Sequence, residues 1–128
     1  MQLNQITLPT TDMDASVRFY ETLGLRLIVD AAPRYVRFVN PADKATVSLH
    51  LVETAKSGEG PVLYFELTDL DDRVAELRAA GLTFEHGPVD QSWLWREARL
   101  RDPYGNLLVL YLAGPNRVNP PWRVARGD

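Results

Sequence analysis

The chain has 128 residues, 45% of them apolar, which suits one compact domain and is too short for two ordinary ones. A net charge of −3, from 14 basic and 17 acidic residues, argues against a nucleic acid partner. The sequence has no cysteine, no signal-peptide pattern and no apolar run of membrane-spanning length. We therefore expect a cytoplasmic protein without disulfides, Cys-ligated metals or a membrane partner.

An internal repeat divides the chain into two similar halves. The segment LPTTDMD at residues 8–14 matches FELTDLD at residues 65–71, and the match continues without a gap. The aligned pairs are 57 residues apart and include Thr11 with Thr68, Asp12 with Asp69, Val17 with Val74, and Gly24 with Gly81.

The first copy predicts a strand, a capped helix and three further strands. Apolar and polar residues alternate over residues 3–8, and Asp12 is expected to be the N-cap of a helix. Val17, Tyr20 and Leu23 follow at helical spacing, and Gly24 is expected to end the helix in a left-handed conformation. The later strands are predicted at residues 25–29, 34–39 and 46–52.

The second copy predicts the same order, with Asp69 as N-cap and Gly81 after the helix. Its later strands are predicted at residues 82–85, 96–101 and 107–112, and the turns Asn40–Asp43 and Asp102–Asn106 occupy equivalent places. We expect one domain made of module one (1–53), a linker (54–60), module two (61–113) and an extended C-terminal tail (114–128).

The runs TTDMDASVRFYETLGL and RDPYGNLLVLYL resemble the first helix and the last hairpin of the vicinal oxygen chelate superfamily, which contains glyoxalases, bleomycin-resistance proteins and extradiol dioxygenases. The resemblance covers nearly the whole chain. It implies an α+β fold in which two tandem βαβββ modules form a cupped eight-stranded mixed sheet. It does not select a function, because this scaffold hosts isomerases, lyases, dioxygenases and drug binders.

Enzymes that this chain resembles usually hold a divalent metal with side chains from the first and last strands of each module. Carried over position by position, the resemblance places Gln5 and Val62 on the first strands and Val109 on the last strand of module two. For the last strand of module one, an ungapped alignment indicates Val47, and a longer hairpin indicates His50. We therefore expect no metal; if Zn, Ni, Mn or Fe is bound, Gln5 and His50 are its expected ligands.

Strand alternation indicates what else lines the cup. Tyr64 and Glu66 share a face with Val62, and Tyr111 shares one with Val109. Residues 91–97 resemble the PWG-RE segment of bleomycin-resistance-like members, with Ser92 and Leu94 in place of the Pro and Gly, and their two Trp residues are either exposed for a contact or part of the core. The expected ligand-binding residues are Gln5, His50, Tyr64, Glu66, Trp93, Trp95, Val109 and Tyr111.

These residues predict a protein of bleomycin-resistance type that binds a small aromatic or amphipathic molecule without a metal, and the resemblance implies a homodimer. Gln5 and His50 are read equally as pocket groups and as hydrogen-bonded core groups. The alternative is a lyase, isomerase or dioxygenase that uses a non-standard metal site or His50 as a general acid or base near Tyr64 and Glu66. Trp122 is expected to anchor the tail over the cup or over the partner.

Overall fold

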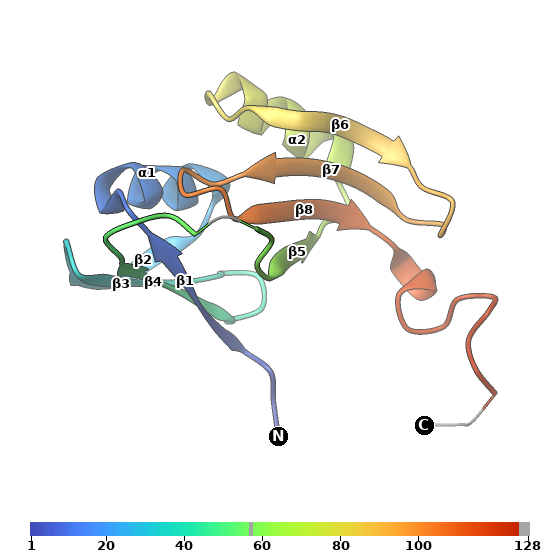
Figure 1. The fold of residues 1–128 in the computed structure, drawn as a ribbon. Coiled ribbons are helices and arrows are strands. Elements are labelled where there is room, and N and C mark those ends of the chain that lie inside the picture. The colour runs from blue at the N-terminus through green and yellow to red at the C-terminus, as the bar shows by residue number, and fades with distance from the viewer. Residues whose placement is uncertain (57, 126–128) are drawn as a thin grey trace.

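The structure is a computed structural model that describes residues 1–56 and 58–125. Two βαβββ modules follow one another along the chain, as the repeat predicts (Figure 1). Module one contains β1 (Gln5–Thr10), α1 (Met13–Leu23), β2 (Arg26–Ala31), β3 (Tyr35–Val39) and β4 (Thr46–Leu51). Module two contains β5 (Val62–Glu66), α2 (Leu70–Ala79), β6 (Phe84–Asp90), β7 (Arg96–Arg101) and β8 (Leu107–Leu112).

The eight strands form two four-stranded mixed sheets, with the strand orders β1-β4-β3-β2 and β5-β8-β7-β6. In each sheet the first strand pairs in parallel with the last, and the other pairs are antiparallel. The predicted α+β fold is confirmed, and the structure adds that β1 and β5 are edge strands of separate sheets. No helix in the described part of the chain is long and apolar enough to cross a membrane.

The helix ends follow local chemistry. The Asp12 carboxylate accepts a hydrogen bond from the backbone N–H of Ala15 at 3.1 Å, which confirms it as the N-cap of α1. Asp69 occupies the equivalent position before α2, but its side chain makes no capping hydrogen bond. Gly24 ends α1 at φ 116°, and a Cβ there would lie 2.6 Å from Nη2 of Arg73. The left-handed conformation therefore favours glycine at this position.

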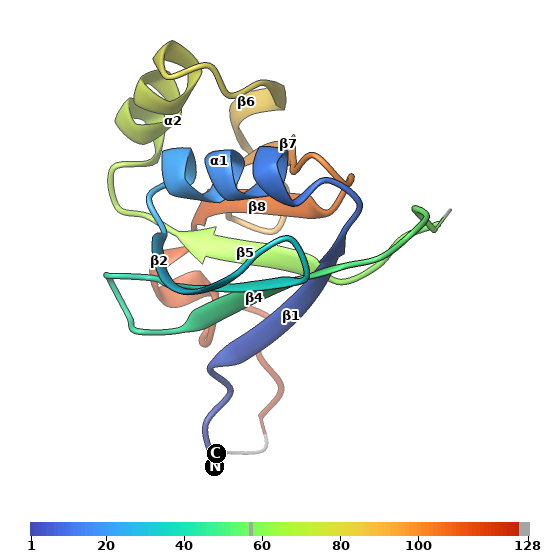
Figure 2. The ribbon, with the colours of Figure 1, turned by 90° about the vertical axis from the view of Figure 1, so that its left-hand side faces the viewer.

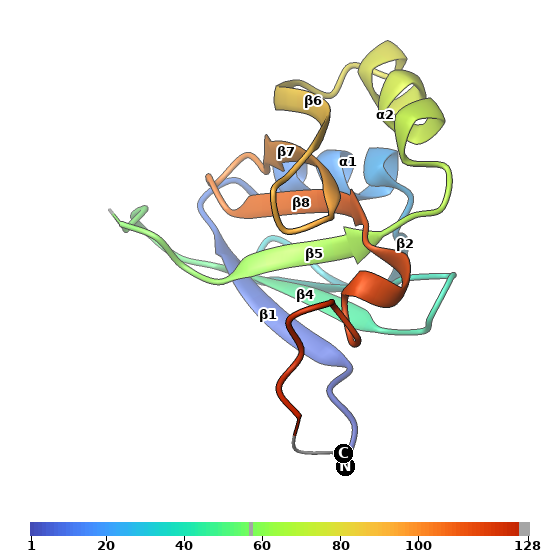
Figure 3. The same cartoon turned by 90° about the vertical axis from the view of Figure 1, so that its right-hand side faces the viewer.

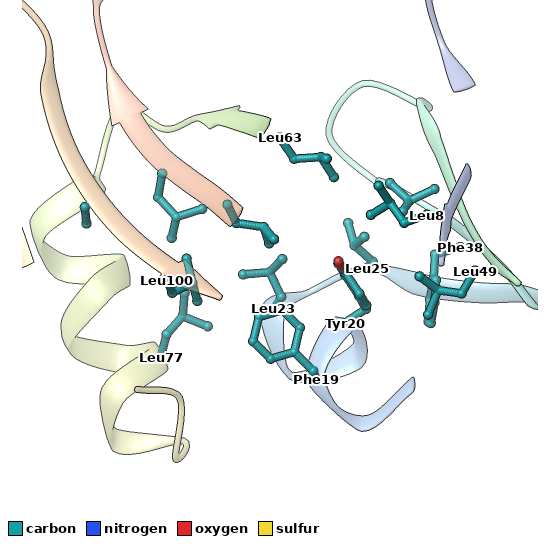
Figure 4. Packing of buried hydrophobic residues seen from close by; sticks show 14 of the residues in the cluster. Leu8, Phe19, Tyr20, Leu23, Leu25, Phe38, Leu49, Leu63, Leu77 and Leu100 are labelled. Carbon is teal, nitrogen blue, oxygen red and sulfur yellow. The ribbon is translucent and has the colours of Figure 1, made fainter. Parts of the chain in front are cut away.

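A single hydrophobic core joins the two modules. Figure 4 shows Phe19 and Leu23 of α1 between Leu100 of module two and Phe38 of module one. In Figures 2 and 3, α1 lies above the first sheet at the level of β7 and β8. Each sheet thus turns one face toward the shared core, and strand alternation directs its other face outward.

Asp102, in the β7–β8 turn, connects the modules by hydrogen bonds. The Tyr20 hydroxyl donates to Oδ2 of Asp102 at 2.6 Å, and both side chains are buried. Oδ1 of Asp102 accepts from the backbone N–H groups of Tyr104, Gly105 and Asn106. Burial, followed by the negative charge of Asp102, raises the pKa of Tyr20, so its hydroxyl remains a donor. The turn thereby fixes the position of α1 against module two.

The linker and the C-terminal tail differ in how regular their structure is. The predicted linker contacts module two through the backbone N–H of Lys56, which donates to the Tyr104 hydroxyl at 3.0 Å. Residue 57 of the linker lies outside the described residues. The tail is not extended throughout, since it begins with the 3₁₀ helix η1 (Gly114–Asn116) and continues in turns up to Trp122. Trp122 is 57% exposed, which is more than expected for an anchor. Residues 126–128 of the predicted tail lie outside the described residues.

We predict that Tyr20→Phe lowers the free energy of unfolding by about 2 kcal/mol, because it removes a buried hydrogen bond to a carboxylate. Urea denaturation followed by circular dichroism measures the change. Tyr104→Phe is the matched control: its hydroxyl accepts one bond from the linker, and the expected loss is about 1 kcal/mol or less. Equal losses in the two variants would contradict the central role of the Tyr20–Asp102 bond.

Candidate functional site

The outward face of the first sheet carries a connected set of polar side chains, which we call the polar face. Nε2 of Gln5 donates to the Ser48 hydroxyl at 3.0 Å and to the Thr7 hydroxyl at 3.1 Å. The hydroxyls of Ser48 and Tyr35 are 2.7 Å apart, and Nε of Arg37 donates to the Tyr35 hydroxyl at 3.0 Å. Neighbouring side chains therefore hold this face in one conformation across β1, β4 and β3.

The strand register identifies Ser48 as the counterpart of Val109. Thr7 pairs with Ser48 in module one, and Tyr64, which lies 57 residues after Thr7, pairs with Val109 in module two. The segment between the paired strands has six residues in module one (40–45) and five in module two (102–106). Module one therefore has one extra residue here. Val47 would be the counterpart of Val109 only with no extra residue, and His50 only with three. Val47 is the neighbour of Ser48 on β4, so its side chain lies on the opposite face of the sheet, in the core.

His50 lies two residues beyond Ser48 on the polar face, opposite Pro9 and Tyr35, and it is exposed. Gln5 pairs with Thr46, so Gln5 and His50 are separated by four positions along adjacent strands. Four positions correspond to about 13 Å. The structure therefore does not bring together the two residues that the sequence offered as metal ligands.

The outward face of the second sheet carries three aromatic rings, which we call the aromatic face. The rings of Trp95 and Tyr111 stack with their centroids 4.7 Å apart, and the Tyr64 ring meets both edge-on, at 5.9 and 5.5 Å. Tyr111 and Val109 are buried, whereas Tyr64 is 48% exposed. Burial, followed by the charge of Glu66, raises the pKa of Tyr111, so this phenol stays neutral. Tyr64 is therefore the ring most accessible to a ligand.

Glu66 and Glu97 lie on the aromatic face and already have partners. Oε2 of Glu66 accepts from the backbone N–H groups of Ala113 and Gly114 at 2.9 Å, so Glu66 holds the start of the tail. Oε2 of Glu97, which is 2% exposed, accepts from Nε1 of Trp93 at 2.8 Å. Both carboxylates thus stabilise the segments around the aromatic face.

The two Trp residues of the 91–97 segment have different surroundings. Trp95 packs against the small cluster of Val109, Tyr111 and Ala113, while Trp93 is 42% exposed. Between them Leu94 adopts φ 67°, a conformation that glycine favours. Ser48, Tyr35 and Arg37 were not predicted as residues of the outer faces, and Glu97 bonds Trp93 on the aromatic face. Strand alternation marks all four, but residue type alone does not.

A cleft of about 740 Å³ lies between the modules. It is bounded by the edge strands β1 and β5, the end of α1 and the β3–β4 hairpin. The cleft reaches core side chains of both modules, including Leu25, Leu63 and Leu77, and it also touches Gln5 and Tyr64. Its lining thus combines buried core side chains with polar residues of the strand ends and the β3–β4 hairpin.

In this register, the four positions that the resemblance marks for metal ligands are Gln5, Ser48, Val62 and Val109. Two of these side chains are aliphatic, and the Gln5 amide is hydrogen-bonded to the neutral Ser48 hydroxyl. No group of three or more His, Cys, Asp or Glu side chains able to hold a metal ion occurs among residues 1–56 and 58–125. This donor set does not fit a divalent ion, which normally takes about three or more protein ligands in a catalytic site.

The comparisons with known proteins agree with this architecture. The family model for the Glyoxalase/Bleomycin resistance protein/Dioxygenase superfamily matches residues 2–110. The uncharacterized protein YraH of Bacillus subtilis is 33% identical over 125 residues, covering 87% of this chain and 98% of that protein.

Solved structures of the same superfamily share the fold. A glyoxalase/bleomycin resistance protein/dioxygenase from Nocardioides is 26% identical with a TM-score of 0.75, and the match covers 88% of this chain and 83% of that one. A bleomycin-binding protein solved in complex with bleomycin is 24% identical with a TM-score of 0.71, covering 88% and 98%. The chain therefore belongs to the glyoxalase/bleomycin resistance protein/dioxygenase superfamily.

Proposed function

We propose that this protein binds a small aromatic or amphipathic molecule without a metal ion. The observation that carries the proposal is the ring cluster of Tyr64, Trp95 and Tyr111 beside Val109, where the family's enzymes usually have a metal ligand. A half-exposed ring above two packed rings offers a rigid surface for stacking. Val62, which is exposed, adds apolar contact area, and neither Val62 nor Val109 can bind a metal ion.

We further propose that the ligand lies in a cup formed by two copies of the chain. Within one chain the polar face and the aromatic face both point away from the shared core, so neither covers the other. The cleft is lined by side chains of both modules, and Leu3 at its edge is fully exposed. Edge strands with free backbone groups, together with open apolar surface, favour pairing with a second copy. In such a dimer the polar face of one copy would lie beside the aromatic face of the other.

Isothermal titration calorimetry against a panel of glycopeptides, aromatic acids and aromatic amides tests the binding proposal. Tyr64→Leu is expected to weaken any aromatic ligand about tenfold, because it removes the exposed ring and keeps the apolar contact. Tyr104→Leu, in the β7–β8 turn, is the control and should leave the affinity unchanged. A panel without any binder, or equal weakening by both substitutions, would end this proposal.

Metal analysis tests the metal-free part separately. Protein purified without a chelator should contain less than about 0.1 ion per chain, and addition of Ni, Zn, Mn or Fe should not raise the melting temperature, because a ligand that binds only the folded state would raise it. A stoichiometric ion, or a metal-dependent rise in melting temperature, would refute it.

The assembly is tested by sedimentation equilibrium, which should show a dimer. Leu3→Glu should shift the equilibrium toward monomer, since a charge would be buried in the contact, and it should not lower the stability of the monomer because Leu3 is exposed there. Ala75→Glu, which places the same charge on the exposed side of α2, is the control. A wild-type monomer at all concentrations would exclude the two-copy cup.

A further inference from the structure

Arg37 and Arg99 occupy equivalent positions in the two modules. Arg37 pairs with Ser48 across β3 and β4, and Arg99 pairs with Val109 across β7 and β8. Each arginine is therefore the cross-strand neighbour of a position where the family's enzymes usually have a metal ligand. The core residues on either side of each arginine direct both side chains to the outer faces.

Arg37 is oriented by its neighbours. Its Nε donates to the Tyr35 hydroxyl, and its guanidinium carbon lies 5.6 Å from the centre of the Tyr35 ring. Hydrogen bonds from Ser48 and then from Arg37 lower the pKa of Tyr35, which is the direction expected beside a cation. The outward positions of β1 to β4 include a second cation, Arg26, and no Asp or Glu. The polar face thus carries positive charge that no carboxylate of that face neutralises.

Arg99 lies between Val109 and His86 in the strand register, and it is half-buried. The nearest carboxylate along its own strand, Glu97, is bonded to Trp93. Glu66 on the same face binds the backbone of the tail, and Arg101 is paired with Glu85 at 2.9 Å. Within the described part of the chain, neither Arg37 nor Arg99 forms an ion pair. Both guanidinium groups therefore keep donors for a ligand.

We propose that the ligand is an aromatic carboxylate, with its carboxylate bound by Arg37 of one copy and Arg99 of the other and its ring stacked on the aromatic face. The proposal rests on the proposed function and names its ligand class. The planar guanidinium matches a carboxylate in a two-point contact, and its donors cannot lose their charge near neutral pH. Two such cations beside the family's metal positions take over the attraction for anionic oxygen atoms that a metal would exert.

The test compares 2-naphthoate with 2-naphthamide by calorimetry on the full-length protein. These compounds share one ring system and differ in charge. We expect the acid to bind at least about tenfold more tightly than the amide, since hydrogen bonds between charged groups are stronger than neutral ones. Arg37→Gln and Arg99→Gln should each remove most of this preference, because they weaken the charged acid much more than the neutral amide. Arg18→Gln, on the exposed side of α1, is the matched control and should behave as the wild type.

The outcomes separate this inference from the proposed function. Equal binding of the acid and the amide by the wild type would overturn the carboxylate site and leave aromatic binding intact. Loss of the preference in only one arginine variant would overturn the two-arginine arrangement. Failure of both compounds to bind would overturn the inference together with the function on which it rests. The wild-type comparison needs no variant, and melting temperatures establish that each variant is folded.

Discussion

The buried hydrogen bond between Tyr20 and Asp102 determines how the two modules meet. A carboxylate shielded from water is stable only when its oxygen atoms are satisfied, and here one oxygen accepts three backbone N–H groups while the other accepts the Tyr20 hydroxyl and the Asn106 amide. The same Asn106 amide also donates to the carbonyl of Pro9 at 3.3 Å. The β7–β8 turn is thus tied to both α1 and β1, and α1 must lie between the two sheets.

This arrangement separates structural from functional surface. One face of each sheet is buried in the shared core, so any ligand site must use an outer face or the cleft between the modules. The repeat shows how the outer faces have diverged on one backbone: Gln5 corresponds to Val62, Thr7 to Tyr64, and Ser48 to Val109. Module one has become a hydrogen-bonded polar surface and module two an aromatic one. A cup that combines them would offer a ligand two different walls.

Sequence reasoning predicted the fold well because its signals are local. The Asp12 cap, the left-handed Gly24 and the turn at Asp102 each follow from a few neighbouring residues, and the repeat supplies them twice. Register is harder to predict, since one extra residue between β3 and β4 moves the counterpart of Val109 from Val47 to Ser48 and leaves His50 two residues further on. The partners of Glu66 could not be predicted either, because they belong to a tail whose path depends on tertiary contacts.

Arg37 shows why residue type alone misleads at such a site. In a chain of net negative charge an arginine looks like an ordinary solvated cation, and neither Arg37 nor Arg99 was among the residues predicted to bind a ligand. The register changes that interpretation, because Arg37 and Arg99 recur at the same point of the repeat, beside Ser48 and Val109. In a cup without metal ligands, any attraction for an anion has to come from side chains. In the proposed two-copy cup, the equivalent residues Arg37 and Arg99 would supply that attraction.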